Sequence, residues 1–186
     1  MATTGSILVV GSINTDMVVR TGHLPMPGET VMGHSFTTTP GGKGANQAVA
    51  VARLGGECTL IGRLGTDSFG RTIRSALIAE GINCQGITQT DASSTGVAVI
   101  TVDAGGENAI VVDPGANGLA NADDDIFSHE DFFEEAEVVV VQLEIPLSVV
   151  QATVRMAKRH NCQVILDPAP VPADRALPSE LFNVDV

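Results

Sequence analysis

The first residues whose types and spacing could do chemistry follow the opening apolar run at 7–10. Residues 11–16 read Gly-Ser-Ile-Asn-Thr-Asp. In an extended chain, residues two apart point to the same side, so Asn14 and Asp16 would face one site. An amide and a carboxylate placed in this way can donate to and accept from hydroxyl groups, which suits a polyol. A polar turn with local side-chain capping is the competing interpretation, and this segment taken alone favours it.

A glycine-rich segment at 40–48 forms the second candidate and runs directly into a helical pattern. It reads Pro-Gly-Gly-Lys-Gly-Ala-Asn-Gln-Ala. Glycine lets a ligand approach the backbone, and Gly42 and Asn46 would face one site because they are one helical turn apart. Lys43 opposes the helix dipole at this end, and such a cost indicates a use. The spacing matches neither a P-loop nor a dinucleotide-binding fingerprint, and a loop that only begins a helix is the alternative.

Two carboxylates close apolar runs further along the chain. Glu144 follows the run at 138–143, and Asp167 follows the run at 164–166. Ligands of open α/β sheets bind at the carboxyl ends of parallel strands, where a carboxylate can hold a hydroxyl group. Either residue could cap the following helix instead, and for Asp167 a capping or loop role is the stronger prediction.

Buried strands and amphipathic helices alternate along much of the chain. Strand-like runs rich in β-branched residues and helical patterns with one apolar face are both present. The strand-like runs lie at 7–10, 58–61, 138–143 and 164–166, and the helical patterns at 68–80 and 146–160. This order predicts an α/β fold with a mostly parallel sheet, right-handed crossovers and helices on both faces.

Two stretches, at about 17–40 and 96–112, break this alternation. They contain short alternating strands and glycine-rich turn signals without a helix between them. The pattern predicts a small antiparallel sheet apart from the core, which could serve as a lid. The acidic stretch at 123–137 is interrupted by one isoleucine and three phenylalanines, and this favours a solvated helix face over an interaction tail.

The net charge of −12, from 10 basic and 22 acidic residues, argues against the basic surface that nucleic acids and anionic membranes require. A small-molecule partner is expected, and a phosphate donor would need a divalent cation beside so acidic a chain. Cys58, Cys84 and Cys162 have no metal-ligand spacing, which predicts free thiols in a reducing compartment. With no membrane-length apolar run, we expect a cytoplasmic protein without membrane or nucleic-acid partners.

Taken together, these segments resemble the ribokinase-like members of the PfkB carbohydrate kinase family along essentially the whole chain. The motif Gly-Gly-Lys-Gly-Ala-Asn-Gln-Ala at 41–48 is specific within that family. Further matches are Pro27-Gly28-Glu29-Thr30, Ser94-Thr95-Gly96-Val97-Ala98, Gly106-Glu107-Asn108, Gly115-Ala116-Asn117 and Gln142-Leu143-Glu144. The resemblance implies that residues 1–186 form the N-terminal part of a single ribokinase-like α/β domain, with its C-terminal part missing.

The resemblance also implies an activity, which is ATP-dependent phosphorylation of D-ribose at the 5-hydroxyl to give ribose 5-phosphate. Mg²⁺ would accompany the nucleotide, K⁺ would act as a monovalent activator, and the lid strands would form a homodimer. Carried over, the sugar-binding residues are Asn14, Thr15, Asp16, Gly42, Lys43, Gly44, Ala45, Asn46 and Glu144. Apolar lid contacts are implied for Ala98, Ile100 and Val112.

Two signatures of the family are absent from these 186 residues. One is Gly-Ala-Gly-Asp, whose Asp is the catalytic base, and the other is the Asn-x-x-Glu motif near the nucleotide phosphates and the metal. We therefore assign no catalytic residue to this chain and expect almost no turnover from it alone. The alternatives are a non-catalytic sugar-binding or regulatory fragment and a PfkB kinase for another sugar or a nucleoside.

Expression of the chain as written should give a poorly soluble or partly molten product. A strand expected to begin near Phe182 would have no successor beside it, which exposes backbone groups and apolar surface. Size-exclusion chromatography and calorimetry test this expectation. A sharp, cooperative melt of a monodisperse sample would contradict it.

Overall fold

A five-stranded, wholly parallel sheet forms the centre of the fold. The computed structural model describes residues 5–170 and 177–186. The strand order is β5-β4-β1-β8-β9, and every pairing within it is parallel. Its strands are β1 (Ser6–Val10), β4 (Glu57–Gly65), β5 (Ile87–Thr90), β8 (Val138–Gln142) and β9 (Gln163–Asp167). The predicted parallel α/β sheet is confirmed, although β5 was not foreseen because it is short and only partly buried.

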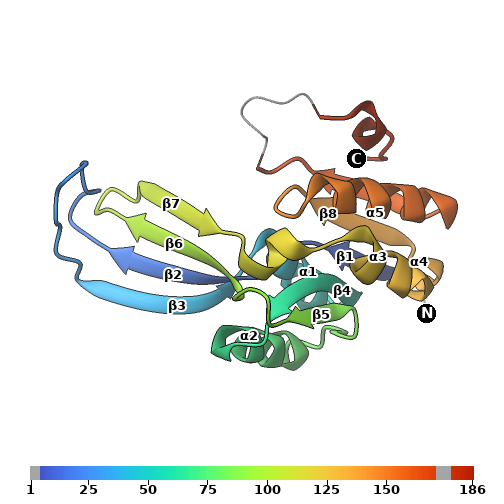
Figure 1. The fold of residues 1–186 in the computed structure, drawn as a ribbon, viewed down its shortest axis with the longest axis horizontal. Helices are drawn as coiled ribbons and strands as arrows, with labels where there is room; N and C mark the ends of the chain where they lie inside the picture. The colour runs from blue at the N-terminus through green and yellow to red at the C-terminus, as the bar shows by residue number, and fades with distance from the viewer. Residues whose placement is uncertain (1–4, 171–176) are drawn as a thin grey trace.

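Helices cover both faces of this sheet, as its apolar strands require (Figure 1). The amphipathic helices α1 and α2 pack on one face around Leu60 and Leu64, whereas α4 and α5 pack on the other around Leu8 and Val139. The α-helices are α1 (Lys43–Arg53), α2 (Ser68–Ala79), α3 (Ala122–Asp125), α4 (Glu130–Glu135) and α5 (Leu147–Arg159). The 3₁₀ turns are η1 (Gly115–Leu119), η2 (Phe127–His129) and η3 (Ser179–Phe182). The helical patterns at 68–80 and 146–160 correspond to α2 and α5.

A second sheet of four strands projects from the carboxyl edge of the parallel sheet, and we call it the lid sheet (Figure 1). Its strands, in the spatial order β3-β2-β6-β7, are β3 (Ser35–Gly41), β2 (Asn14–Arg20), β6 (Gly96–Val102) and β7 (Asn108–Asp113). The outer pairings are antiparallel as predicted, but the central pair β2 and β6 is parallel. The two strands run together because they continue β1 and β5, which leave the main sheet in the same direction.

The acidic stretch at 123–137 does not form the single solvated helix face that its sequence predicted. It breaks into the short segments α3, η2 and α4. Asp125 is buried, and its carboxylate lies 2.9 Å from Nη2 of Arg63 and accepts a 2.6 Å hydrogen bond from the hydroxyl of Thr88. These contacts tie α3 to β4 and β5, so the stretch is bound to the main sheet.

The residues around Phe182 form the turn η3 and not the expected strand. Beyond it, the N–H of Asp185 donates to the carbonyl of Val164, and the N–H of Leu166 donates to the carbonyl of Val186. These bonds satisfy part of the outer edge of β9. The three cysteines are free and buried. Across the described ranges, no helix is both long enough and apolar enough to cross a membrane.

Replacing Asp125 by alanine should lower the free energy of unfolding by about 3 kcal/mol, because the mostly buried side chain of Arg63 loses its fully buried partner. Arg155→Ala is the matched control, since its pair with Glu180 is exposed and should contribute less than about 0.5 kcal/mol. Urea denaturation of the full-length gene product, followed by circular dichroism, measures both values. Equal decreases in the free energy of unfolding of the two variants would show that burial of the Asp125 pair does not contribute to stability.

Candidate functional site

A polar pocket of about 150 Å³ lies where the lid sheet meets the carboxyl edge of the main sheet. Polar side chains reach it from the start of β2, from the first turn of α1 and from the loop after β8, and apolar side chains reach it from β6 and β7. The lining consists of Asn14, Asp16, Gly42, Lys43, Asn46, Ala98, Ile100, Ile110, Val112 and Glu144. The pocket therefore combines hydrogen-bonding groups on one side with an apolar cover on the other.

The structure gathers most of the predicted site residues in this lining, but Thr15, Gly44 and Ala45 are not among them. Thr15 is buried, and its hydroxyl has no hydrogen-bond partner within the described part of the chain. Gly44 and Ala45 are buried where α1 begins. Ile110 lines the pocket although it was not predicted. It lies two residues before Val112 on the same strand, and this spacing could have indicated that both side chains face the pocket. The binding roles of all these residues stay predictions.

Helix α1 begins against the loop after β1, so closely that a side chain would not fit. Gly42 has a φ of 89°, and a Cβ there would lie 2.7 Å from both the carbonyl oxygen of Ser12 and the amide nitrogen of Asn14. The N–H of Ala45 donates to the same Ser12 carbonyl at 3.0 Å. This approach requires glycine and brings Lys43 beside the root of β2.

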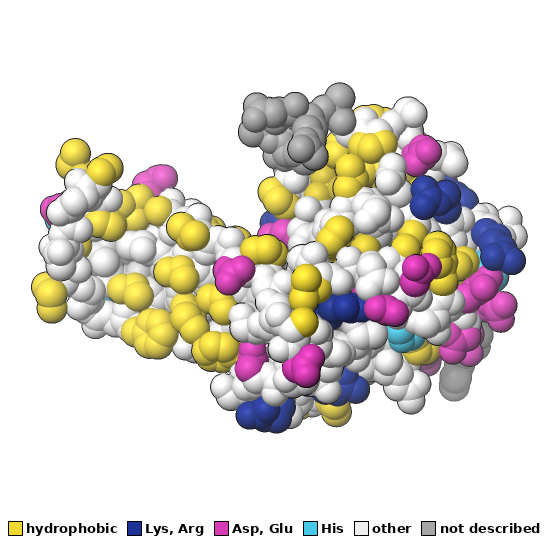
Figure 2. Space-filling view, in the orientation of Figure 1, with side chains coloured by type: hydrophobic (Ala, Val, Ile, Leu, Met, Phe, Trp, Pro, Cys, Tyr) yellow, Lys and Arg dark blue, Asp and Glu magenta, His cyan; other side chains and the backbone are white. Residues whose placement is uncertain are grey.

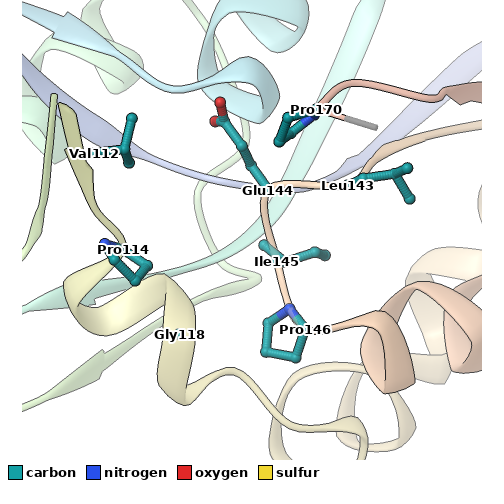
Figure 3. A pocket seen from close by; sticks show the side chains of 8 residues that line it. All are labelled: Val112, Pro114, Gly118, Leu143, Glu144, Ile145, Pro146 and Pro170. Carbon is teal, nitrogen blue, oxygen red and sulfur yellow. The ribbon is translucent and has the colours of Figure 1, made fainter. Parts of the chain in front are cut away.

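Glu144 lies on the loop between β8 and α5, and Figure 3 shows its carboxylate pointing away from Pro146. The hydroxyl of Ser12 donates to its Oε2 at 2.6 Å, and the backbone N–H of Lys43 donates to the same oxygen at 3.3 Å. The ammonium of Lys43 lies 3.7 Å from Oε1. Lys43 therefore neutralises a carboxylate inside the pocket, which gives a physical reason for a cation at a helix N-terminus.

Asp16 faces Glu144 from the lid sheet. Its carboxylate lies over Gly41, where any side chain would overlap it. Burial raises the pKa of Asp16, and the negative charge of Glu144 raises it further. Two carboxylates that accept and an ammonium that donates can together hold several hydroxyl groups of one small molecule.

Two buried polar residues behind the pocket were missed by sequence reasoning. Ser12 holds Glu144, and Asn117 on η1 bonds to the backbone of Ile13 and to the side chain of Asn14. Both residues are about 1% exposed, so their polar groups depend on these partners. Each lies more than 100 residues from one of its partners, and no local pattern in the sequence reveals such a contact.

Asp167 ends β9 as predicted, but it is absent from the lining of the polar pocket. Its carboxylate accepts a 3.2 Å hydrogen bond from the side chain of Gln47. Gln47 in turn accepts from the side-chain amide of Gln142 at the end of β8. These hydrogen bonds tie α1 to the ends of β8 and β9, and the capping or loop role of Asp167 stays a prediction.

A wider and mostly apolar cavity of about 370 Å³ adjoins the polar pocket and shares Val112 and Glu144 with it (Figure 3). The loop at 143–146 before α5 and the turn η1 form much of its wall. Its remaining lining residues are Pro114, Gly118, Leu143, Ile145, Pro146 and Pro170. Glu144 thus stands between a polar space and an apolar one.

Comparison with known proteins shows relatives that match across both sheets. The model of the pfkB family of carbohydrate kinases matches residues 4–184. Ribokinase from Schizosaccharomyces pombe is 41% identical over 172 residues, which cover 89% of this chain and 54% of that protein. Deoxyribokinase from Salmonella typhi is 37% identical over 165 residues, covering 88% and 53%.

The fold has a solved counterpart in Arabidopsis thaliana ribokinase complexed with ribose and ATP. The TM-score is 0.84 at 33% identity, and the match covers 96% of this chain and 57% of that one. The chain thus spans about half the length of the relatives it matches. Because the family model extends over nearly all of its residues and the solved counterpart covers both sheets, this chain belongs to the pfkB family of carbohydrate kinases.

Proposed function

We propose that the complete protein is a ribokinase, which transfers the γ-phosphoryl group of ATP to the 5-hydroxyl of D-ribose to give ribose 5-phosphate. This chain supplies its sugar pocket. The observation that carries the proposal is the joint presence of Asn14, Asp16, Lys43 and Glu144 in one small pocket beneath the lid sheet. The ribokinase relative at 41% identity and the ribose and ATP named for the solved counterpart support it.

The chemistry of the pocket suits a sugar with several hydroxyl groups. Asp16 and Glu144 would accept hydrogen bonds from hydroxyl groups, and the ammonium of Lys43 would donate to a hydroxyl oxygen. Ala98 and Val112 would cover the C–H surface of the sugar and exclude water. Such positioning matters because phosphoryl transfer depends mainly on the placement and electrostatic stabilisation of its reactants.

The proposal assigns Mg²⁺ to the nucleotide and K⁺ to an activating site. No group of three or more His, Cys, Asp or Glu residues within 5–170 and 177–186 could hold a metal ion. The proposal assigns both ions outside these residues. The catalytic base is assigned outside this chain too, because the Gly-Ala-Gly-Asp signature is not in its sequence.

We further propose a cytoplasmic homodimer that forms through the lid sheet. Hydrophobic side chains are spread over the visible face of this sheet (Figure 2). Phe36, Val99 and Val111 of the lid sheet are exposed, and a second copy of the chain could cover such surface. The net charge of −12 argues against nucleic acid or an anionic membrane as partner.

A second candidate is phosphorylation of a deoxy sugar, which the deoxyribokinase relative favours. A third is sugar binding without catalysis. Kinetics with a panel of sugars separates the first two, since a pocket that pairs its polar groups with every hydroxyl of ribose discriminates against a sugar that lacks one. Equilibrium binding of ribose without any ATP consumption would favour the third.

Lys43→Ala in the full-length gene product should raise the KM for ribose at least about tenfold and change the KM for ATP little, because the ammonium lies in the sugar pocket beside Glu144. Ribose-dependent ATP consumption measures both constants. Lys158→Ala serves as the control, since Lys158 lies on α5 and its ammonium pairs with Asp185. A selective rise in the KM for ATP would contradict the sugar role of Lys43.

Ribose affinity should fall as the pH drops through the pKa of Asp16, because only the ionised carboxylate accepts from two hydroxyl groups. That pKa is raised by burial and by Glu144, so the loss should begin at a higher pH than an ordinary aspartate would give. Calorimetric titration with ribose across the acid range gives the profile. Asp16→Asn should bind ribose weakly, and its affinity should no longer fall with pH in this range. An unchanged pH dependence in that variant would assign the titration to another group.

A further inference from the structure

Asn117 is a buried asparagine whose side chain reaches back to the root of β2. Its Oδ1 accepts from the backbone N–H of Ile13 at 2.9 Å. Its Nδ2 lies 3.1 Å from the carbonyl oxygens of both Ile13 and Pro114, and 2.8 Å from Oδ1 of Asn14. Both polar atoms of this side chain are therefore hydrogen-bonded within the protein, and the residue does not line the pocket.

The backbone fixes the orientation of the Asn117 amide. A backbone N–H can only donate and a backbone carbonyl can only accept, so the atom facing the N–H of Ile13 must be oxygen. The atom facing the two carbonyls must then be nitrogen. Reversing the amide would set its oxygen against both carbonyls and its nitrogen against an N–H, at the cost of three hydrogen bonds.

The orientation of Asn14 follows from that of Asn117. Because Asn117 presents an N–H, the facing atom of Asn14 must be its oxygen, and the NH₂ group of Asn14 is left toward the pocket that this residue lines. Within the described ranges, Nδ2 of Asn14 makes no hydrogen bond. Gly96 leaves the space for this pair, since a Cβ there would overlap both Oδ1 of Asn14 and Nδ2 of Asn117.

We propose that Asn117 is a positioning residue which holds the carboxamide of Asn14 with its NH₂ group toward the sugar, so that Asn14 acts as a donor to a hydroxyl oxygen. The inference rests on the proposed function and extends it. Asn14 and Asp16 then offer a donor and an acceptor side by side, which matches one hydroxyl group that accepts and a neighbouring one that donates.

The direct test is Asn117→Asp in the full-length gene product, with ribose affinity measured by calorimetric titration. A carboxylate at 117 cannot donate, so Asn14 would turn its NH₂ group toward it and its oxygen toward the sugar. Ribose affinity should fall at least about tenfold. In an Asn14→Ala background, the same substitution should change ribose affinity less than about twofold, because the group through which Asn117 acts is gone.

A second variant tests the orientation even if Asn117→Asp folds poorly. Asn14→Asp keeps an oxygen for Asn117 but replaces the NH₂ group in the pocket by an acceptor. It should lose at least about tenfold in ribose affinity. Wild-type affinity in this variant would show that an acceptor at position 14 serves the sugar, and the proposal would fall.

Asn121→Ala provides the control for a merely structural effect. Asn121 caps α3 through the N–H of Asp124 at 2.9 Å, four residues after Asn117. Its loss should lower the melting temperature and leave ribose affinity unchanged. An equal loss of affinity here, or additive losses in the double variant, would overturn the positioning role.

The outcomes for this inference and for the proposed function are distinct. A wild-type protein that binds ribose while Asn117→Asp binds it equally well would refute the positioning role alone. A folded wild-type protein that binds no ribose would refute the proposed function and the inference with it.

Discussion

The site depends on the contact between the start of α1 and the loop that follows β1. Gly44 approaches so closely that a Cβ there would lie 2.8 Å from the Cα of Gly11. Gly11 has no room for a side chain either, because the side chain of Gln142 from β8 occupies that space. The ends of β1 and β8 therefore meet the helix with almost nothing between them. Only this approach lets Ser12 and Lys43 reach Glu144 together.

Several charges at this contact lower the local stability of the fold, but they make the pocket polar. Lys43 at the first turn of α1 opposes the helix dipole, whereas the nearby carboxylate of Glu144 is favoured there. Glu144 and Asp16 repel each other, and burial adds to the cost. A polyol that donates to both carboxylates would lower this repulsion and so offset part of the electrostatic cost of ionising Asp16.

Local patterns in the sequence predicted which residues close together in the chain face the same site. They did not predict contacts between residues far apart in the chain. Alternation placed Asn14 and Asp16 on one side of a strand, and one helical turn placed Gly42 and Asn46 at one pocket. The pairs of Ser12 with Glu144 and of Asn117 with Ile13 span 132 and 104 residues, and no periodicity encodes them. The same limit explains the error in the acidic stretch at 123–137, because Asp125 on α3 pairs with Arg63 on β4.

The parallel pairing of β2 with β6 links the lid sheet to the floor of the pocket. Asn14 pairs with Gly96 and Asp16 pairs with Ala98, so the polar floor and the apolar cover lie on adjacent strands of one sheet. Glu144 lies on the loop after β8 of the main sheet, and Lys43 is the first residue of α1. A rotation of the lid sheet about its root would therefore carry Asp16 and Ala98 together relative to Glu144. Strand β2 therefore supplies the polar floor of the pocket and, through its pairing with β6, holds the apolar cover beside it.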